Sequence, residues 1–192
     1  MLAPDPITQF AAWWEVAEAE VPLPDAMTLA TVDSDGAPDA RTVLLKGFGD
    51  DGFRFFTNRE SAKGVQLAAS PRAALVVYWR ELDRQIRVRG NVGQMSDIES
   101  DAYFATRPRD SQLGAWASPQ SRPLRDRGEL DARLREVTER FGDGEVPRPP
   151  HWGGYVLRHD QVEFWQGQVG RLHDRFAYRR DGAAWLIERL GP

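Results

Sequence analysis

The stretch MTLATVD (27–33), followed by a Ser34-Asp35-Gly36 turn and ARTVLLK (40–46), decides the fold class. Apolar and β-branched residues fill both runs, and the turn between them is typical of a β-hairpin. Further strand patterns are found at 53–58, 72–79, 84–92, 155–159, 161–166, 171–179 and 184–190. Strands at both ends of the chain, with helical patterns between them, predict the α+β class.

The helical patterns are placed around this sheet. Asp5-Pro6 is a typical helix start, and we expect an N-terminal helix over 5–21. A short helix is expected at 61–70, and three more are expected within 96–141, where Ser96 and Glu99 have capping-box spacing. We therefore predict a single domain over 1–192. Its core is an antiparallel barrel whose first and last strands share one sheet, with peripheral helices and a helical insertion at 96–141.

The composition excludes several classes of protein. Lys plus Arg is 25 and Asp plus Glu is 29, so the net charge of −4 argues against a nucleic-acid binder. The chain has no cysteine, which excludes disulfides and thiolate metal sites. The start, MLAPDPITQF, lacks the pattern of a secretory signal, and no apolar run is long enough for a membrane span. We expect a cytoplasmic protein that contacts no membrane.

Two apparent motifs carry no chemistry. Gly47 to Gly52 matches G-x-G-x-x-G, but the run leads into the strand at 53–58, whereas a dinucleotide site requires a helix there. We therefore interpret it as a turn. His151, His159 and His173 lack metal-ligand spacing, so we expect no metal site.

Basic residues near the first strands favour anion binding. Ser61-Ala62-Lys63-Gly64 opens a helix directly after a strand, which places N–H groups, a hydroxyl and an ammonium together. Taken alone, a capped surface helix explains the same residues. Arg41 and Lys46 are five apart, so a regular strand would point them to opposite sides. Exposed basic residues would give the same pattern.

A second set of polar residues surrounds a helix break at Pro108. Tyr103 and Arg107 are four apart, and Arg109 and Ser111 follow the break. A phenol, a guanidinium and a hydroxyl that converge there suit a phosphate dianion. The alternative is a group of surface charges that flank the break.

A third set lies near the C-terminus. If 171–179 is a strand, Arg171, His173 and Arg175 share one face and would repel one another without an anion or an electron-rich ring between them. A solvated edge strand is the alternative. The preceding EFWQG (163–167) places an aromatic ring and an amide nearby, which favours a site.

These segments, in this order, resemble the pyridoxamine 5′-phosphate oxidases from about Asp5 to Pro192. The resemblance rests on ARTVLLKGF (40–48), FFTNRESAKG (55–64), RQIRVRG (84–90), YFATRPRDSQLGAWAS (103–118), PQSRP (119–123), WGGY (152–155), VEFWQG (162–167) and RLHDRF (171–176). RPRDSQ together with FWQG and RLHDR is highly specific. The resemblance implies a split β-barrel and a homodimer with FMN at the subunit interface.

The resemblance also implies roles for individual residues. The flavin would be lined by Arg41, Thr42, Val43, Leu44, Leu45, Lys46, Phe56 and Thr57, and its phosphate end would be held by Ser61 and Lys63. The cofactor site would be completed by Gln85 and, from the partner subunit, Gln120, Ser121, Trp165 and Arg175. The substrate phosphate would be bound by Lys46, Tyr103, Arg107 and Ser111. Arg171 and His173 would bracket the pyridine ring as the catalytic residues.

The implied reaction is the FMN-dependent oxidation of pyridoxamine or pyridoxine 5′-phosphate to pyridoxal 5′-phosphate, with O₂ reduced to H₂O₂. The protein would contribute orientation and electrostatics to a redox step that the cofactor carries. Two alternatives stay open. One is a paralogous flavin oxidase that acts on another reduced ring, such as a dihydrophenazine precursor, although such relatives usually lose RPRDSQ. The other is a non-catalytic protein that binds FMN or pyridoxal phosphate.

Two features depart from the family pattern. Many members have Arg where this chain has Ala62, so we expect one phosphate contact fewer. The chain also begins close to its first helix, without the basic, Tyr-containing segment that closes over the substrate in some members. We expect this difference to alter turnover or substrate choice.

Overall fold

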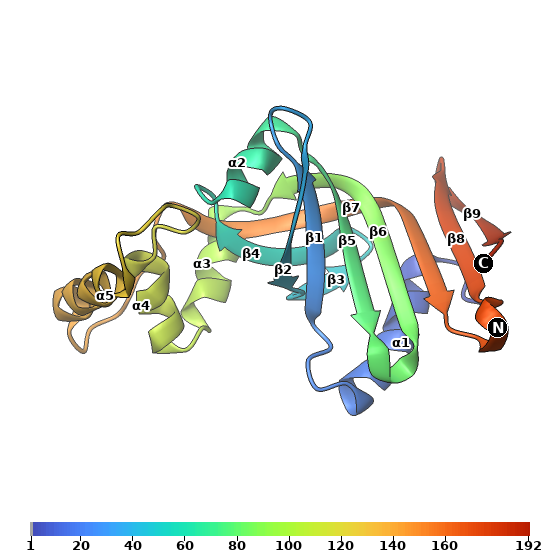
Figure 1. Cartoon of the computed structure of the whole chain (residues 1–192), viewed down its shortest axis with the longest axis horizontal. Helices are drawn as coiled ribbons and strands as arrows, with labels where there is room; N and C mark the ends of the chain where they lie inside the picture. The colour runs from blue at the N-terminus through green and yellow to red at the C-terminus, as the bar shows by residue number, and fades with distance from the viewer. Residues whose placement is uncertain (1) are drawn as a thin grey trace.

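One antiparallel sheet of nine strands runs through this computed structural model, which describes residues 2–192 (Figure 1). The strands are β1 (Ala26–Val32), β2 (Pro38–Leu44), β3 (Gly47–Gly49), β4 (Gly52–Asn58), β5 (Arg72–Trp79), β6 (Arg84–Gln94), β7 (Trp152–Gln166), β8 (Asp174–Asp181) and β9 (Ala184–Leu190). The helices are α1 (Pro6–Glu20), α2 (Ala62–Ala69), α3 (Asp97–Ala105), α4 (Arg109–Ala117) and α5 (Arg127–Phe141), with short 3-10 turns η1 (Arg80–Leu82) and η2 (Val169–Arg171). The predicted α+β class is confirmed.

The sheet curls into a barrel that stays open. Its hydrogen-bonded order is β2-β1-β5-β6-β7-β4-β3, and β8 pairs with both β7 and β9. Just after β2, the Lys46 N–H donates to the Arg54 carbonyl of β4 at 2.8 Å, so the two sides of the opening approach each other. Within residues 2–192 no ladder joins β2 to β4, and the barrel is therefore split, as predicted. All strands from β1 to β9 belong to this one sheet, and the single domain stays a prediction.

The long strand β7 connects the two ends of the molecule. Its first residues pair with β4, its last residues pair with β8, and β6 runs beside most of its length. The register of β6 shifts between Arg89 and Gly90. A Cβ atom on Gly90 would lie 1.9 Å from the Arg158 carbonyl oxygen of β7, so this crossing accepts only glycine.

Local capping explains where the helices begin. The Asp5 carboxylate accepts the Thr8 N–H at 2.8 Å, and Pro6 opens α1 as expected. Ser96 and Glu99 form the predicted capping box at the start of α3. The completely buried Phe10 anchors α1, because its ring packs against the rings of Phe48, Phe53 and Trp79 in the barrel core.

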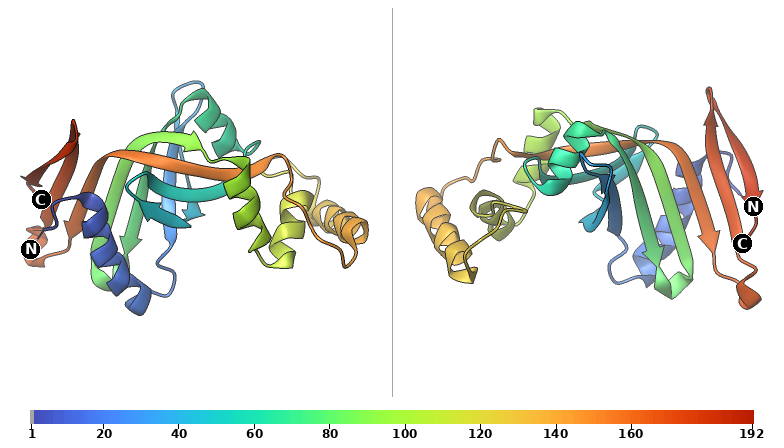
Figure 2. Two further views of the ribbon diagram at one scale, coloured as in Figure 1. Left: turned by 180° about the vertical axis from the view of Figure 1, so that it is seen from behind. Right: turned by 45° about the horizontal axis from the view of Figure 1, so that its top comes forward.

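The elements spread toward two opposite ends (Figures 1 and 2). Helices α3, α4 and α5 lie at one end, where Phe104, Leu113, Val146 and Trp152 form a smaller hydrophobic cluster. The β8–β9 hairpin lies at the other end. No helix within residues 2–192 is long and apolar enough to cross a membrane.

Three boundaries differ from the sequence prediction. The predicted loop 47–52 contains β3, which forms a hairpin with β4, so the G-x-G-x-x-G match is indeed a turn between strands. The strands predicted at 155–159 and 161–166 form one strand, β7, that already begins at Trp152. The strand predicted at 171–179 begins only at Asp174, because Gly170 and Arg171 turn the chain with φ values of 71° and 62°. The shared strand face expected for Arg171, His173 and Arg175 is therefore wrong.

A buried histidine in β7 predicts a pH-dependent stability. His159 is 6% exposed, its ring stacks on Trp185 at 5.4 Å between centroids, and its Nδ1 has no hydrogen-bond partner within residues 2–192. Burial, with a smaller contribution from Arg180, lowers the pKa of His159. The unfolded chain therefore takes up a proton below about pH 6.5 that the folded chain resists, and stability falls as the pH falls.

We expect His159→Phe to reduce this loss of stability between about pH 6.5 and 5.5. The slope attributable to one such histidine is at most about 1.4 kcal/mol per pH unit. Urea unfolding of parent and variant at the two pH values measures the difference. Equal losses in both proteins would show that His159 is not the group that titrates.

Candidate active site

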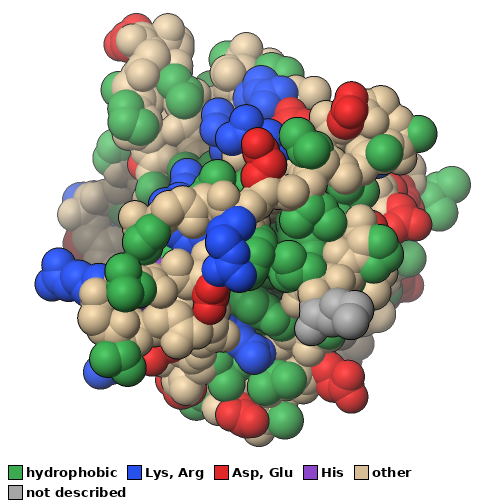
Figure 3. Space-filling model, turned by 90° about the vertical axis from the view of Figure 1, so that its right-hand side faces the viewer, with side chains coloured by type: hydrophobic (Ala, Val, Ile, Leu, Met, Phe, Trp, Pro, Cys, Tyr) green, Lys and Arg blue, Asp and Glu red, His purple; other side chains and the backbone are tan. Residues whose placement is uncertain are grey.

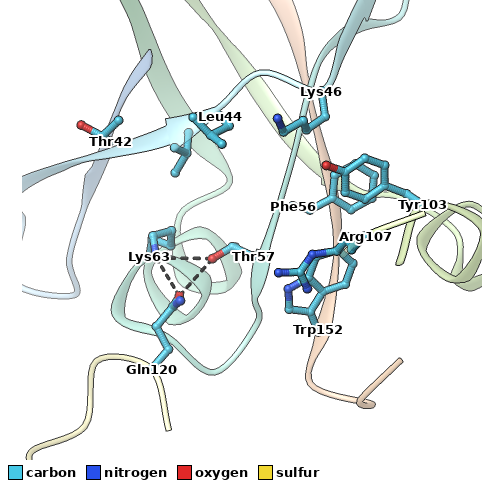
Figure 4. Close-up of a pocket in the computed structure, with 11 residues that line it drawn as sticks. Thr42, Leu44, Lys46, Phe56, Thr57, Lys63, Tyr103, Arg107, Gln120 and Trp152 are labelled. Atoms are coloured by element: carbon cyan, nitrogen blue, oxygen red, sulfur yellow. Dashed lines mark hydrogen bonds between the residues drawn. The ribbon is translucent and has the colours of Figure 1, made fainter. Parts of the chain in front are cut away.

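A cavity of about 300 Å³ opens between β2, β4, α2, α3 and the segment after α4 (Figure 4). Its wall combines cationic, hydroxyl and aromatic side chains. Ten predicted site residues line it: Thr42, Val43, Leu44, Lys46, Phe56, Thr57, Lys63, Tyr103, Arg107 and Gln120. The structure therefore brings together segments of the chain that are far apart in sequence.

Lys63 provides a buried positive charge on one side of the cavity. Only 9% of the residue is exposed, and its ammonium donates to Gln120 Oε1 at 2.9 Å and Thr57 Oγ1 at 3.3 Å (Figure 4). Burial, followed by repulsion from Arg41, lowers the pKa of Lys63. Within residues 2–192 no carboxylate pairs with it. An anionic ligand would restore the stabilisation that this ammonium loses by leaving water.

Arg107 provides a second positive charge, on the side of the cavity opposite to Lys63. Its guanidinium carbon lies 4.8 Å from the centroid of Trp152 and 5.3 Å from that of Phe104. Its Nη1 is buried and has no hydrogen-bond partner in the described chain, and burial lowers the pKa of Arg107. Sequence spacing placed Arg107 on a helix with Tyr103, but α3 ends at Ala105. Both side chains nevertheless line the cavity.

The third cation of the cavity is already paired. Lys46 Nζ donates to the Asp25 carboxylate at 2.7 Å, and both side chains are about three-quarters buried. Lys46 lies beyond the end of β2 at Leu44, so the strand argument that related it to Arg41 does not apply. Arg41 instead donates to Leu29 O at 3.3 Å and to Gln66 Oε1 at 3.0 Å.

An aromatic wall connects the cations. The rings of Tyr103 and Phe56 stack with centroids 3.9 Å apart, and Trp152 lies nearly parallel to Phe56 at 5.3 Å (Figure 4). Sequence reasoning missed Trp152, although WGGY belonged to the family resemblance. The available signal was a tryptophan at the start of a strand, next to the Gly153-Gly154 pair.

A neighbouring cavity of about 240 Å³ shares Arg107, Gln120 and Trp152 with the first. Ser111 opens into this second cavity, so Arg107 is the predicted phosphate ligand that borders both. We expected Gln120 to come from a second subunit, but in this chain it contacts its own Lys63.

The remaining predicted residues of this half lie beside the cavity. Ser61 is completely buried, caps α2 and donates to the Asn58 carbonyl at 2.7 Å. Leu45 belongs to the hydrophobic core. Ser121 lies on a separate surface pocket with φ of 68°. Arg109 was grouped with the phosphate ligands, but it donates to the carbonyls of Gly142 and Gly144 and so holds the end of α5.

A second group of predicted residues lies at the other end of β7. Gln85, Trp165 and Arg175 stand opposite one another on β6, β7 and β8. The His173 ring lies 4.6 Å from Trp165, and Arg171 precedes it in η2. From Trp152 to Trp165 the strand extends for about 40 Å. We call these five residues the C-terminal group. They lie around the last residues of β7, whereas the cavity lies at its first residue, Trp152.

Salt bridges hold part of the C-terminal group. Glu163 is 6% exposed and binds Arg175 through Nε at 2.9 Å and Nη2 at 2.8 Å, and its other oxygen accepts from Arg87 at 3.1 Å. His173 Nδ1 accepts the Gln168 N–H at 3.1 Å, which orients the imidazole. The Arg175 guanidinium and the His173 imidazole are thus held in place without a ligand.

Family comparisons cover almost the whole chain. Residues 14–141 match the model of the pyridoxamine 5′-phosphate oxidase family. Residues 152–192 match the pyridoxine 5′-phosphate oxidase C-terminal dimerisation region, which contains most of the C-terminal group.

Individual relatives are similar over the same span. The chain is 58% identical to a pyridoxine/pyridoxamine 5′-phosphate oxidase of Cupriavidus necator, covering 100% of this chain and 91% of that protein. It is 56% identical to the oxidase of the same name from Rubrobacter xylanophilus, over 98% of this chain and 88% of that protein.

Among solved structures, PhzG from Burkholderia lata in complex with tetrahydrophenazine-1-carboxylic acid has a TM-score of 0.93 and 34% identity, over 99% of this chain and 94% of that one. A pyridoxamine 5′-phosphate oxidase-related, FMN-binding protein of Nostoc punctiforme has a TM-score of 0.77 at 22% identity, over 98% of both chains, and shows the same fold.

Proposed function

Because the chain belongs to the pyridoxamine 5′-phosphate oxidase family, we propose that it oxidises pyridoxamine or pyridoxine 5′-phosphate to pyridoxal 5′-phosphate, using FMN and O₂. One observation carries this proposal: the buried Lys63 and the partly buried Arg107, neither of which pairs with a carboxylate within residues 2–192, lie on either side of an aromatic-walled cavity. Such a cavity suits two phosphorylated aromatic molecules.

The Lys63 side fits the phosphate of FMN. The ammonium, the Thr57 hydroxyl and the N-terminus of α2 lie together there. The positive end of the helix dipole and its unpaired N–H groups favour an anion. Ala62 opens this helix, and the weaker phosphate contact expected from it stays a prediction. Bound FMN would supply the redox chemistry, in which a hydride equivalent from the substrate and one further proton reduce O₂ to H₂O₂.

The Arg107 side fits the phosphate of the substrate. The free Nη1 of Arg107 offers a charge-assisted donor, and Tyr103 and Lys46 line the same space. Ser111 lines the neighbouring cavity, which Arg107 also borders. Anchored by its phosphate, the pyridine ring would lie against the stacked rings of Phe56 and Tyr103, and these residues would orient the substrate without a nucleophile of their own.

The rest of the site is proposed to come from a second copy of the chain. Arg171 and His173 follow the far end of β7, whereas the cavity lies at its beginning, beside Trp152 (Figure 1). The end of the molecule that carries them exposes hydrophobic side chains (Figure 3), including Val169 at 95% and Leu172 at 73% exposure. A homodimer would cover this surface and bring Arg171 and His173 to the partner's cavity.

Backbone geometry supports a functional role for this turn. Within residues 2–192 three non-glycine residues have positive φ, namely Asp83, Ser121 and Arg171, and two of them are predicted site residues. Strained backbone of this kind concentrates at ligand sites.

The cytoplasmic location stays a prediction.

Anaerobic mixing of the purified, flavin-loaded protein with pyridoxamine 5′-phosphate tests the proposal. We expect the yellow absorbance of the flavin to bleach as pyridoxal 5′-phosphate forms, and to return with production of H₂O₂ when O₂ is admitted. Unphosphorylated pyridoxamine should bleach the flavin far more slowly at the same concentration, because it lacks the group that Arg107 binds. A protein that stays yellow with the phosphorylated substrate would contradict the proposal.

The structural similarity to PhzG makes a reduced phenazine precursor the second candidate substrate. The same anaerobic mix with a dihydrophenazine carboxylic acid distinguishes the two. Bleaching by this acid alone would favour the second candidate.

A further inference from the structure

Arg107 is a partly desolvated cation held by aromatic rings. Its guanidinium lies over Trp152 and Phe104, whose rings meet edge to face with centroids 5.1 Å apart. The buried Nη1 has no partner in the described chain. No carboxylate within residues 2–192 forms a salt bridge with this side chain. The negative faces of aromatic rings are therefore the groups that compensate its charge before an anion binds.

Trp152 is placed to hold this guanidinium in position. The residue is 6% exposed, begins β7 and packs with Phe104 and Leu113 in the smaller hydrophobic cluster. Its indole also lines both neighbouring cavities, as Arg107 does. The start of a strand thus presents the ring to Arg107 beside the two cavities that both residues line.

The geometry points to Trp152 as a positioning residue that aims Arg107 at the substrate phosphate. This inference rests on the proposed function, since it assigns the anion at Arg107 to the substrate. Carboxylate partners would serve the same end less well, because they would compete with the phosphate for the guanidinium. An aromatic ring stabilises the cation and leaves its N–H donors free.

Trp152→Leu is expected to raise KM for pyridoxamine 5′-phosphate by about three- to tenfold, while kcat and flavin content stay near parental values. Trp152→Phe keeps an aromatic face and should recover most of the affinity. Fluorinated tryptophans incorporated at position 152 keep the shape of the ring but weaken its negative face. Affinity should therefore fall stepwise with each added fluorine, which a purely structural role does not predict.

Trp116→Leu is the matched control. Trp116 packs against the same cluster, and the Arg140 guanidinium carbon lies 4.8 Å from its centroid, but it does not line the cavity. We expect it to lower stability and leave KM unchanged. If Trp116→Leu raises KM as much as Trp152→Leu does, cluster packing explains both and the inference is overturned.

A double-mutant cycle completes the test. In an Arg107→Ala background, Trp152→Leu should have no further effect on KM, because the ring acts through the missing guanidinium. Additive effects, or no dependence of affinity on fluorination, would overturn the inference.

A separate measurement uses no turnover: inorganic phosphate is titrated into the flavin-loaded parent and Trp152→Leu proteins. Weaker phosphate binding in the variant, with no oxidation of pyridoxamine 5′-phosphate by the parent, would refute the proposed function and leave the role of Trp152 intact. Equal phosphate binding in both proteins would refute the role of Trp152.

Discussion

Arg107→Ala is expected to raise KM for pyridoxamine 5′-phosphate by about 10- to 150-fold, with nearly parental flavin content. The range corresponds to the loss of one charge-assisted hydrogen bond to phosphate, about 1.5–3 kcal/mol. The parent structure supports a large effect, because the guanidinium is partly desolvated and its buried Nη1 has no hydrogen-bond partner within residues 2–192. Lys63 lies across the cavity and is unchanged, so the flavin should stay bound. Steady-state kinetics and the flavin absorbance of the purified protein measure the two quantities.

Arg109→Ala is the control for this variant. Arg109 is two residues away, but its guanidinium donates to the carbonyls of Gly142 and Gly144 and does not line the cavity. Its removal should lower the stability of the α4–α5 region and leave KM within about twofold of the parent. If Arg107→Ala has parental kinetics, Arg107 is not a substrate ligand and the phosphate must bind elsewhere.

Heterodimers of an Arg107→Ala chain and a His173→Ala chain should regain about half of the parental kcat/KM, although each variant alone loses tenfold or more. If the cavity of one subunit works with His173 of the other, the heterodimer contains one doubly altered site and one intact site. The intact site arises because the His173→Ala chain contributes its Arg107, and the Arg107→Ala chain contributes its His173.

Co-expression with two different affinity tags, followed by purification on both, isolates the heterodimer. A site built within one subunit would leave each half of the heterodimer with one altered residue, and activity would stay as low as in the single variants. The two arrangements therefore differ by about fivefold or more in activity. Leu172→Val in place of His173→Ala is the control, because Leu172 is 73% exposed, has no proposed contact with the substrate, and should leave the activity of its homodimer unchanged.

Short-range patterns in the sequence predicted local structure well. Asp5-Pro6 starts α1 and the Ser96–Glu99 capping box starts α3, because a cap involves residues within one helical turn. The strand boundaries were predicted wrongly in two situations. In one the boundary depends on pairing with a strand that is distant in sequence, and in the other it depends on a strained backbone conformation at one or two residues. β7 continues through 160 because β6 shifts its register there, and β8 starts late because Gly170 and Arg171 take left-handed φ values.

The sequence by itself determined the class of the protein: its family motifs, its α+β pattern, and the residue types that a phosphate- and flavin-binding site requires. Tertiary structure alone decided how these residues are grouped. By residue spacing Arg107 and Arg109 both flank the break at Pro108, but the fold packs Arg107 against Trp152 and uses Arg109 to hold α5. Likewise, the length and pairing of β7 place His173 beyond the end of the strand opposite to the cavity, and we propose that a second subunit completes the site. Burial and distance between remote segments arise from packing, which residue spacing along the chain does not encode.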